Sequence, residues 1–169
     1  LLEDADKFSC YNRDRSLVFL VANNSYNFLV GYVGLLRGNK VVALINNTIN
    51  QSSFDELIRR FKPAFIFKPN NLFSLDEKWK NKLTIGGYNL FETEIEDEYK
   101  IHDSLSMLLM TSGSTGSPEF VRLSYSNIYS NTLAICQYLG ISVNDKAIST
   151  LPMSYSYGIS IINTHLFSG

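Results

Sequence analysis

The chain has 169 residues, of which 45% are hydrophobic and 18% charged, and its formal net charge is -1. This length and composition are typical of one globular α/β domain. A nearly neutral chain without a basic stripe, and without an apolar run near the ~20 residues of a membrane span, is expected neither to bind nucleic acid nor to cross a membrane.

The chain opens with the pattern of a buried strand followed by an amphipathic helix. The continuously apolar run at 16–22 is short and in part β-branched, as a strand covered on both faces would be. Asn24 or Ser25 can cap a helix at 26–37, and Gly38 stands where helices commonly end.

The same pattern then repeats. A second apolar strand is predicted at 40–45, and a third at 64–67. Between them, Ser53 and Glu56 have the spacing of a capping box for a helix at 54–61. A βαβαβ order with short connections predicts an α/β fold, in which a parallel-rich sheet is flanked by helices.

The second half of the chain is less regular but continues the alternation. A cluster of acidic residues at 92–100 is interpreted as a solvated face. Short strands are expected around 82–87 and 88–92, followed by a strand at 104–111 and a loop at 112–118. A helix is expected at 125–139, capped by Ser124 and ended by Gly140. A strand at 146–151 and a helix from 156 onward complete the expected elements.

Small and hydroxyl residues follow the strand predicted at 104–111. They are Thr111, Ser112, Gly113, Ser114, Thr115 and Gly116. Glycine lets the backbone approach a ligand closely, so the backbone N–H groups and hydroxyls of such a loop can surround phosphate oxygens. Stretches of this composition are also often plain surface loops, and composition alone leaves both interpretations open.

Two familiar nucleotide-binding motifs are excluded for this loop. A P-loop needs a Lys directly after its second glycine, whereas Ser117 and Pro118 follow Gly116. The dinucleotide fingerprint G-x-G-x-x-G needs a third glycine and different offsets.

A third motif matches more closely. "TSGSTGSP" at 111–118, followed by Val121, Ser124 and Asn127, resembles the phosphate-binding signature of the acyl-adenylate-forming superfamily, the AMP-dependent synthetases and ligases. "LPMSYSYGIS" at 151–160 resembles that family's second motif, and 24–49 resembles its early helix–glycine–strand segment. The resemblance implies that residues 1–169 form one N-terminal subdomain, part of the large domain of a longer enzyme.

The resemblance also implies an activity. Enzymes of this family use ATP with Mg²⁺ to convert a carboxylic acid into an acyl-adenylate and pyrophosphate, and commonly transfer the acyl group to CoA or to the phosphopantetheine of a carrier protein. The loop residues from Thr111 to Gly116 would surround the β- and γ-phosphates. Tyr155 occupies a position where the family often has a His or another aromatic residue near the reacting groups, so it is the candidate catalytic residue. The alternative role for Tyr155 is that of a core tyrosine.

The sequence departs from the family signature just after the loop. Glu119 stands where the family has a Lys, and Phe120 stands where it has a Gly. A carboxylate at this position opposes phosphate, and Arg122 is a candidate either to replace the missing cation or to pair with Glu119. The departure leaves a second interpretation open: a degenerate, non-catalytic family member that binds a nucleotide or an acyl group. In either case the 169-residue piece alone is expected to be inactive, because the family's remaining motifs lie downstream.

The cysteine and histidine residues give little indication of metal or redox chemistry. Cys10 and Cys136 are far apart and lack CxxC spacing, which predicts reduced, buried thiols in a cytoplasmic protein. Neither His102 nor His165 belongs to a cluster with ligand spacing, so no metal site formed by protein side chains is expected.

Overall fold

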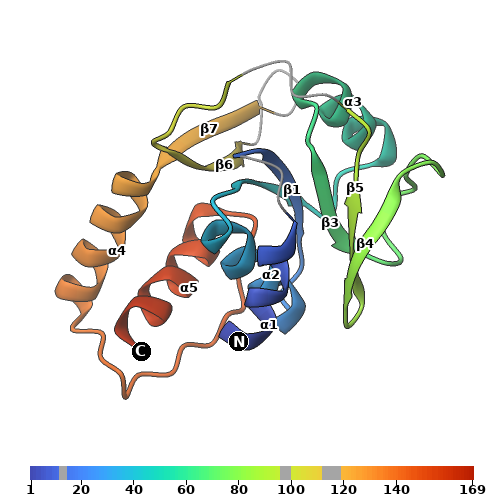
Figure 1. Ribbon diagram of the computed structural model, residues 1–169. Helices are drawn as coiled ribbons and strands as arrows, with labels where there is room; N and C mark the ends of the chain where they lie inside the picture. The colour runs from blue at the N-terminus through green and yellow to red at the C-terminus, as the bar shows by residue number, and fades with distance from the viewer. Residues whose placement is uncertain (12–14, 96–99, 112–118) are drawn as a thin grey trace.

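A seven-stranded mixed sheet forms the centre of the computed structural model, which describes residues 1–11, 15–95, 100–111 and 119–169 (Figure 1). The strands are β1 (Leu17–Ala22), β2 (Val41–Asn46), β3 (Phe65–Pro69), β4 (Lys80–Ile85), β5 (Tyr88–Glu92), β6 (Leu105–Thr111) and β7 (Glu119–Ser124). Their order across the sheet is β4-β5-β3-β1-β2-β6-β7. The predicted α/β fold with a parallel-rich sheet is confirmed.

The four central strands are parallel and the outer ones are antiparallel. β3, β1, β2 and β6 run in the same direction, and the crossovers from β1 to β2 and from β2 to β3 each contain a helix. On one side, β5 pairs antiparallel with both β3 and β4. A two-residue turn, in which Gly86 has φ +54, joins β4 to β5. On the other side, β7 pairs antiparallel with β6. The short strands predicted around 82–87 and 88–92 are confirmed.

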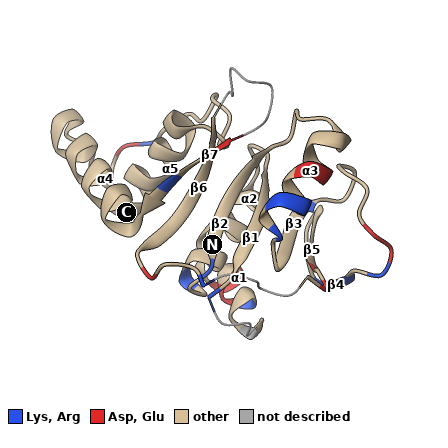
Figure 2. Ribbon diagram, turned by 90° about the horizontal axis from the view of Figure 1, so that it is seen from above, with Lys and Arg blue, Asp and Glu red and all other residues tan. Residues whose placement is uncertain are grey.

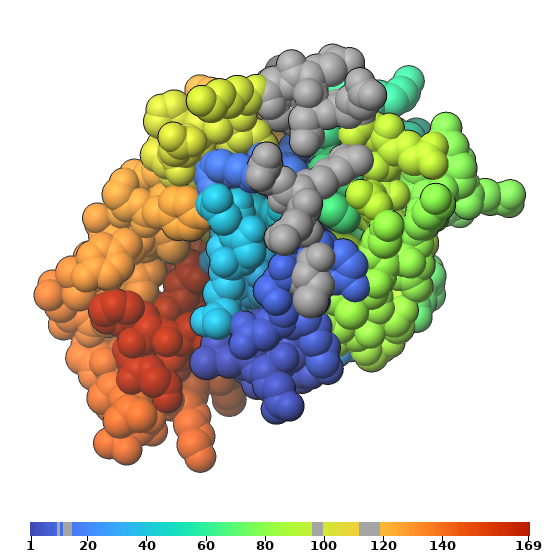
Figure 3. Space-filling model, in the orientation of Figure 1, coloured from blue at the N-terminus to red at the C-terminus, as the bar shows by residue number. Residues whose placement is uncertain are grey.

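Helices cover both faces of the sheet. The main helices are α2 (Tyr26–Arg37), α3 (Gln51–Phe61), α4 (Tyr125–Leu139) and α5 (Ser156–Ser168). Successive residues of β1 point to opposite faces. Val18 and Leu20 therefore join the core beneath α2 and α5, whereas Phe19 and Val21 join the core beneath α3. In Figure 3, α4 and α5 lie together on one side of the molecule and β4 and β5 on the other.

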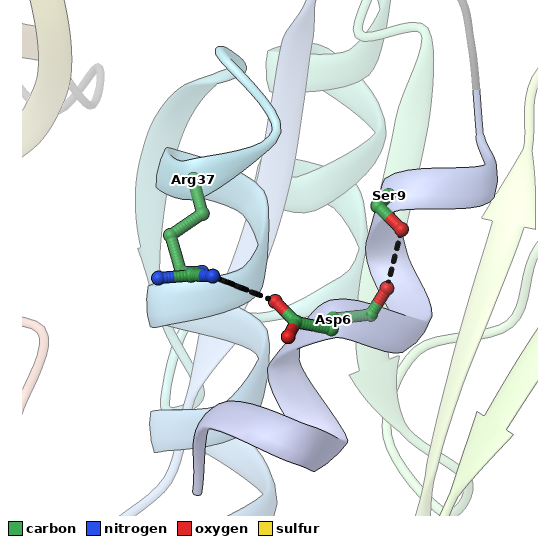
Figure 4. Close-up of polar contacts among 3 residues, drawn as sticks. All are labelled: Asp6, Ser9 and Arg37. Atoms are coloured by element: carbon green, nitrogen blue, oxygen red, sulfur yellow. Dashed lines mark hydrogen bonds and ion pairs between the residues drawn. The ribbon is translucent and has the colours of Figure 1, made fainter.

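The N-terminal segment packs against α2. It consists of the short helix α1 (Leu2–Ala5) and a 3-10 helix, η1 (Asp6–Cys10), which the sequence did not predict. Arg37 Nη2 pairs with Asp6 Oδ1 at 2.9 Å, and Ser9 Oγ donates to the Asp6 carbonyl at 2.6 Å (Figure 4). Beneath this polar layer the Phe8 ring meets Phe67 edge-on, with 5.1 Å between ring centroids, which anchors the segment in the core.

The helix caps agree with the sequence except at α3. Ser25 caps α2, and Ser124 and Asn127 form a capping box at the start of α4. The box predicted from Ser53 and Glu56 is wrong, because α3 begins one turn earlier. Its cap is Asn50, whose side chain accepts a hydrogen bond from the Ser53 backbone.

Two segments of the second half differ from the expected elements. Residues 119–124 form the edge strand β7, which the sequence analysis did not anticipate. Residues 146–151, predicted as a strand, form a connection without strand pairing, in which Ile148 is 82% exposed. The local sequence did not suffice to form a strand, because a strand also needs a neighbouring strand with which to form hydrogen bonds.

Charge is distributed unevenly over this architecture. Figure 2 shows α4 and α5 without Lys, Arg, Asp or Glu, whereas α3 and the β4 region carry both signs. None of the helices in the described ranges combines the length and apolar character needed to cross a membrane. Cys136 is buried on α4 as a free thiol, as predicted; the side chain of Cys10 lies outside the described part.

Candidate functional site

The candidate site lies at the carboxyl ends of the parallel strands β1, β2 and β6. In open α/β sheets ligands bind at this edge, because the loops that leave it converge there. Thr111 is the last residue of β6 and pairs with Glu119, the first residue of β7. Thr111 Oγ1 also donates to the Glu119 carbonyl oxygen at 3.4 Å, so the two ends of the predicted phosphate loop are held together. Its other predicted residues, Ser112, Gly113, Ser114, Thr115 and Gly116, lie outside the described residues.

The second candidate segment reaches the same edge through a turn that precedes α5. Asn24, just after β1, holds this turn from two sides: its Oδ1 accepts from the Met153 backbone N–H at 3.1 Å, and its Nδ2 donates to the Leu151 carbonyl oxygen at 2.9 Å. The Tyr155 backbone N–H donates to the Pro152 carbonyl oxygen at 3.2 Å. These contacts bring the start of α5 to the end of β1.

A glycine permits the close approach within this turn. A Cβ built on Gly158 would lie 2.2 Å from the Pro152 carbonyl oxygen and 2.8 Å from its carbon. Any side chain would therefore force the first turn of α5 away from the chain at Pro152. The Pro-to-Gly spacing of the second motif thus has a packing reason.

Tyr155 is held at the mouth of the site and is not a core residue. Its side chain is 44% exposed, which contradicts the core alternative. Asn46, the last residue of β2, donates from Nδ2 to Tyr155 Oη at 3.0 Å. Asn46 Oδ1 in turn accepts from the backbone N–H and the hydroxyl of Thr48, at 3.1 and 3.0 Å.

Thr111 and Tyr155 line one cavity of about 570 Å³ between β6, β7, α4 and α5. Apolar side chains such as Val121 and Ile159 form about half of its lining, and amide and hydroxyl side chains, among them Asn127 and Asn131 of α4, form the rest. Every described residue that lines this cavity is uncharged. The arrangement suits an apolar ligand that carries hydrogen-bonding oxygen atoms.

Glu119 and Arg122 of β7 line one cavity, together with Phe61 of α3. The strand register pairs Met110 with Phe120 and Leu108 with Arg122, so Phe120 and Arg122 share the α3 side. The Phe120 ring accordingly meets Phe61 of α3, with 4.9 Å between centroids. Within the described part of the chain no ion pair joins Glu119 to Arg122, so the pairing considered from the sequence is absent.

The described residues offer no metal centre of their own. Among them, no group of three or more His, Cys, Asp or Glu side chains is placed to hold a metal ion. His102 Nδ1 instead meets the hydroxyl of Ser104 at 2.9 Å, and His165 Nδ1 lies 2.9 Å from the Ile161 carbonyl oxygen.

Sequence reasoning missed Asn46 and considered Asn24 only as a helix cap. Both are polar residues at or just beyond the end of a buried, predicted strand, and that position alone marks them as residues of the ligand-binding edge. Their partners, Met153 and Tyr155, are far away in the sequence, so the contacts themselves were not predictable.

Known proteins with similar sequences are acid–CoA ligases by name. The 2-succinylbenzoate–CoA ligase of Bacillus cereus (strain ATCC 10987 / NRS 248) is 27% identical over 78 residues, which are 46% of this chain and 16% of that protein. The ligase of the same name from Bacillus mycoides (strain KBAB4) is also 27% identical over 78 residues. The matched segment thus covers about a sixth of the length of these relatives.

Solved structures share the fold over nearly all of this chain. Apo MatB from Rhodopseudomonas palustris matches with a TM-score of 0.75 and 19% identity, over 98% of this chain and 37% of that one. The O-succinylbenzoate Coenzyme A synthetase MenE from Bacillus subtilis, in complex with ATP and magnesium ion, matches with a TM-score of 0.70 and 15% identity, over 99% of this chain and 47% of that one.

A sequence model of the AMP-binding enzymes matches residues 11–169. The chain therefore belongs to the family of AMP-binding enzymes.

Proposed function

We propose that this chain is part of an AMP-forming acid–CoA ligase, with MgATP and a carboxylic acid as substrates. Its membership of the AMP-binding family and the names of its relatives support the reaction class. The observation that carries the proposal is that Thr111 and Tyr155, from two distant motifs, line one cavity at the carboxyl edge of the sheet. The solved MenE structure with ATP and magnesium supports the choice of nucleotide and cation.

In the proposed reaction a carboxylate oxygen attacks the α-phosphorus of ATP, and the bond to pyrophosphate breaks. Pre-positioned donors must then stabilise the charge that collects on the departing phosphates. The loop from Thr111 to Gly116 would supply backbone N–H groups and hydroxyls for this purpose. Mg²⁺, which enters with ATP, would neutralise part of the same charge. Tyr155 would donate a hydrogen bond to an oxygen at the reacting centre.

A thiol acceptor completes the proposed sequence. The thiolate of CoA would attack the acyl carbon of the adenylate, so that a thioester forms and AMP leaves. CoA is preferred because the relatives are CoA ligases by name; phosphopantetheine on a carrier protein offers the same thiol. The 169-residue chain alone is expected to be inactive, since the solved relatives that it matches are more than twice as long.

Glu119 is the feature that favours the alternative, a family member that binds without turnover. Its carboxylate has no ion-pair partner in the described part of the chain, and it follows the phosphate loop directly. At ~6 Å from a phosphate charge, one repulsive pair costs roughly 3 kcal/mol at an effective dielectric of ~20, and about a quarter of that in water. Because Glu119 is exposed, we expect the smaller value to apply.

The test uses the full-length protein with MgATP and a panel of carboxylic acids. Some of these acids have an uncharged tail, and the others are dicarboxylic acids. Pyrophosphate release is followed, and hydroxylamine traps the acyl-adenylate as a hydroxamate. The wild type is compared with Glu119→Lys, and Glu119→Gln separates loss of the negative charge from gain of a positive one. We expect acid-dependent pyrophosphate and hydroxamate from the wild type, with a several-fold lower KM for ATP in Glu119→Lys.

Two other outcomes would change the conclusion. If the wild type shows no activity and Glu119→Lys is active, the non-catalytic alternative is favoured. Failure of ATP to bind either protein in a direct binding measurement would refute the phosphate-loop assignment.

A further inference from the structure

We propose that Asn46 is a positioning residue that fixes the Tyr155 hydroxyl as a hydrogen-bond donor toward the acyl group. This inference rests on the proposed ligase function and extends it to a residue outside the motifs that indicated it. Asn46 is the last residue of β2, at the end of a buried parallel strand. Its Nδ2 donates to Tyr155 Oη at 3.0 Å.

The hydrogen bonds of Asn46 fix which way its amide group faces. The Oδ1 atom accepts two hydrogen bonds, from the Thr48 backbone N–H at 3.1 Å and from the Thr48 hydroxyl at 3.0 Å. A flipped amide would place an NH₂ group against the Thr48 N–H, two donors face to face. The Asn46 backbone N–H is also engaged, with Met110 Sδ at 3.4 Å. Nδ2 is therefore presented to Tyr155 as a donor.

This donor determines what the Tyr155 hydroxyl can do. A phenol has one O–H and can also accept. Since Asn46 Nδ2 occupies an acceptor position of Oη, the hydroxyl hydrogen must point elsewhere. No other hydrogen bond of this hydroxyl occurs within the described residues, and Tyr155 lines the cavity of about 570 Å³. The O–H is thus left to donate to an acceptor oxygen of a bound ligand.

The walls of the cavity indicate the class of that ligand. Every described lining residue is uncharged, and Val121 and Ile159 are apolar. A second carboxylate on the acid would find no cation there. The geometry therefore points to an acyl group with an uncharged tail, whose activated carboxyl oxygen accepts from Tyr155.

The test is a double-mutant cycle in the full-length protein. Asn46→Asp keeps an acceptor for Thr48 but removes the donor to Tyr155, and Tyr155→Phe removes the hydroxyl. Asn47→Asp is the matched control, because it places the same charge one residue away on a side chain that makes no hydrogen bond in the described structure. We expect Asn46→Asp to lower kcat about tenfold, the effect of losing one hydrogen bond. KM for ATP and the activity of the control should each stay within about twofold of the wild type.

The cycle distinguishes positioning from a general structural role. If Asn46 acts through Tyr155, Asn46→Asp causes no further loss of kcat in the Tyr155→Phe protein. If the two losses multiply, or if Asn47→Asp is as slow as Asn46→Asp, the inference is wrong. Within the acid panel, a faster reaction with dicarboxylic acids than with uncharged-tail acids would overturn the assigned ligand class.

A readout that does not need activity separates this inference from the proposed function. Tyrosine is replaced by 3-fluorotyrosine, and the ¹⁹F resonance of residue 155 is assigned by its loss in Tyr155→Phe. We expect that resonance to shift in Asn46→Asp and not in Asn47→Asp. If its chemical shift is unchanged in Asn46→Asp, the hydrogen bond between Asn46 and Tyr155 is refuted. If the resonance shifts but the wild type releases no pyrophosphate with any acid, the ligase proposal fails, and the catalytic use of Asn46 fails with it.

Discussion

Replacing Gly158 by alanine tests whether the turn before α5 sets the position of Tyr155. The new Cβ would lie 2.2 Å from the Pro152 carbonyl oxygen, which is 1.2 Å less than the 3.4 Å at which ordinary contacts begin. It would also lie 3.1 Å from the Met153 Cα, so the obstacle is backbone that cannot rotate away. The start of α5 and the preceding turn must therefore separate by about 1 Å.

That displacement has two measurable consequences. Overpacking of this kind typically costs about 1–3 kcal/mol of unfolding free energy. A misplacement of about 1 Å at a reacting centre can lower the rate by about 10²-fold. We therefore expect Gly158→Ala to lower both the midpoint of denaturant unfolding and the rate of acid-dependent pyrophosphate release, with the larger effect on the rate.

Gly87→Ala is the matched control, because a Cβ at Gly87 would meet nothing within 4 Å. It should leave the rate and the unfolding midpoint near those of the wild type. The reasoning is refuted if Gly158→Ala unfolds and reacts like the wild type, since the close approach to Pro152 would then have no consequence. It is also refuted if the two glycine variants lose activity equally.

Three further predictions concern stability, each measured by denaturant unfolding. Ser124→Ala removes the capping box of α4 and should cost about 1 kcal/mol, whereas Ser130→Ala, in the middle of the same helix, should change little. Tyr32→Phe loses a buried hydroxyl that donates at 2.8 Å and should cost about 1–2 kcal/mol; the exposed Tyr129→Phe is its control, and equal losses would contradict the argument. Burial raises the pKa of Tyr88 to about 12, so its contribution to stability should be complete below about pH 10 and fall as the pH rises toward 12. Tyr88→Phe should flatten that fall, and an unchanged slope would contradict the assigned cause.

The sequence predicted those parts of the fold that depend on local pattern. The buried parallel strands read as continuous apolar runs, and Ser25 and Ser124 cap helices because their hydroxyls bond to backbone N–H groups three residues on. The cap of α3 was assigned to Ser53, one turn too late, since Asn50 offers an equivalent acceptor earlier in the chain. Local chemistry does not decide between two adequate caps.

What the sequence did not predict depends on contacts between distant segments. β7 is exposed on much of its surface, so its apolar pattern is weak, and its pairing with β6 fixes it as a strand. The segment at 146–151 has the pattern of a strand and no partner. The loop and Tyr155 were found through their motifs, but the support of Tyr155 by Asn46 joins residues 109 positions apart. Such support becomes visible only when the strand ends are brought together.

The strand order has a consequence for how the protein folds. β1, β2 and β3 pair within the segment from Leu17 to Pro69, and β5 closes onto β3 soon afterwards. β6 pairs with β2 only after the chain has passed through β3, β4 and β5, as the pairing of Val42 with Met107 shows. Since the entropy of closing a loop grows with its length, we expect the first five strands to form an early unit during synthesis. β6, which carries Thr111, would then add to a preformed edge, and the ligand-binding edge would be completed last.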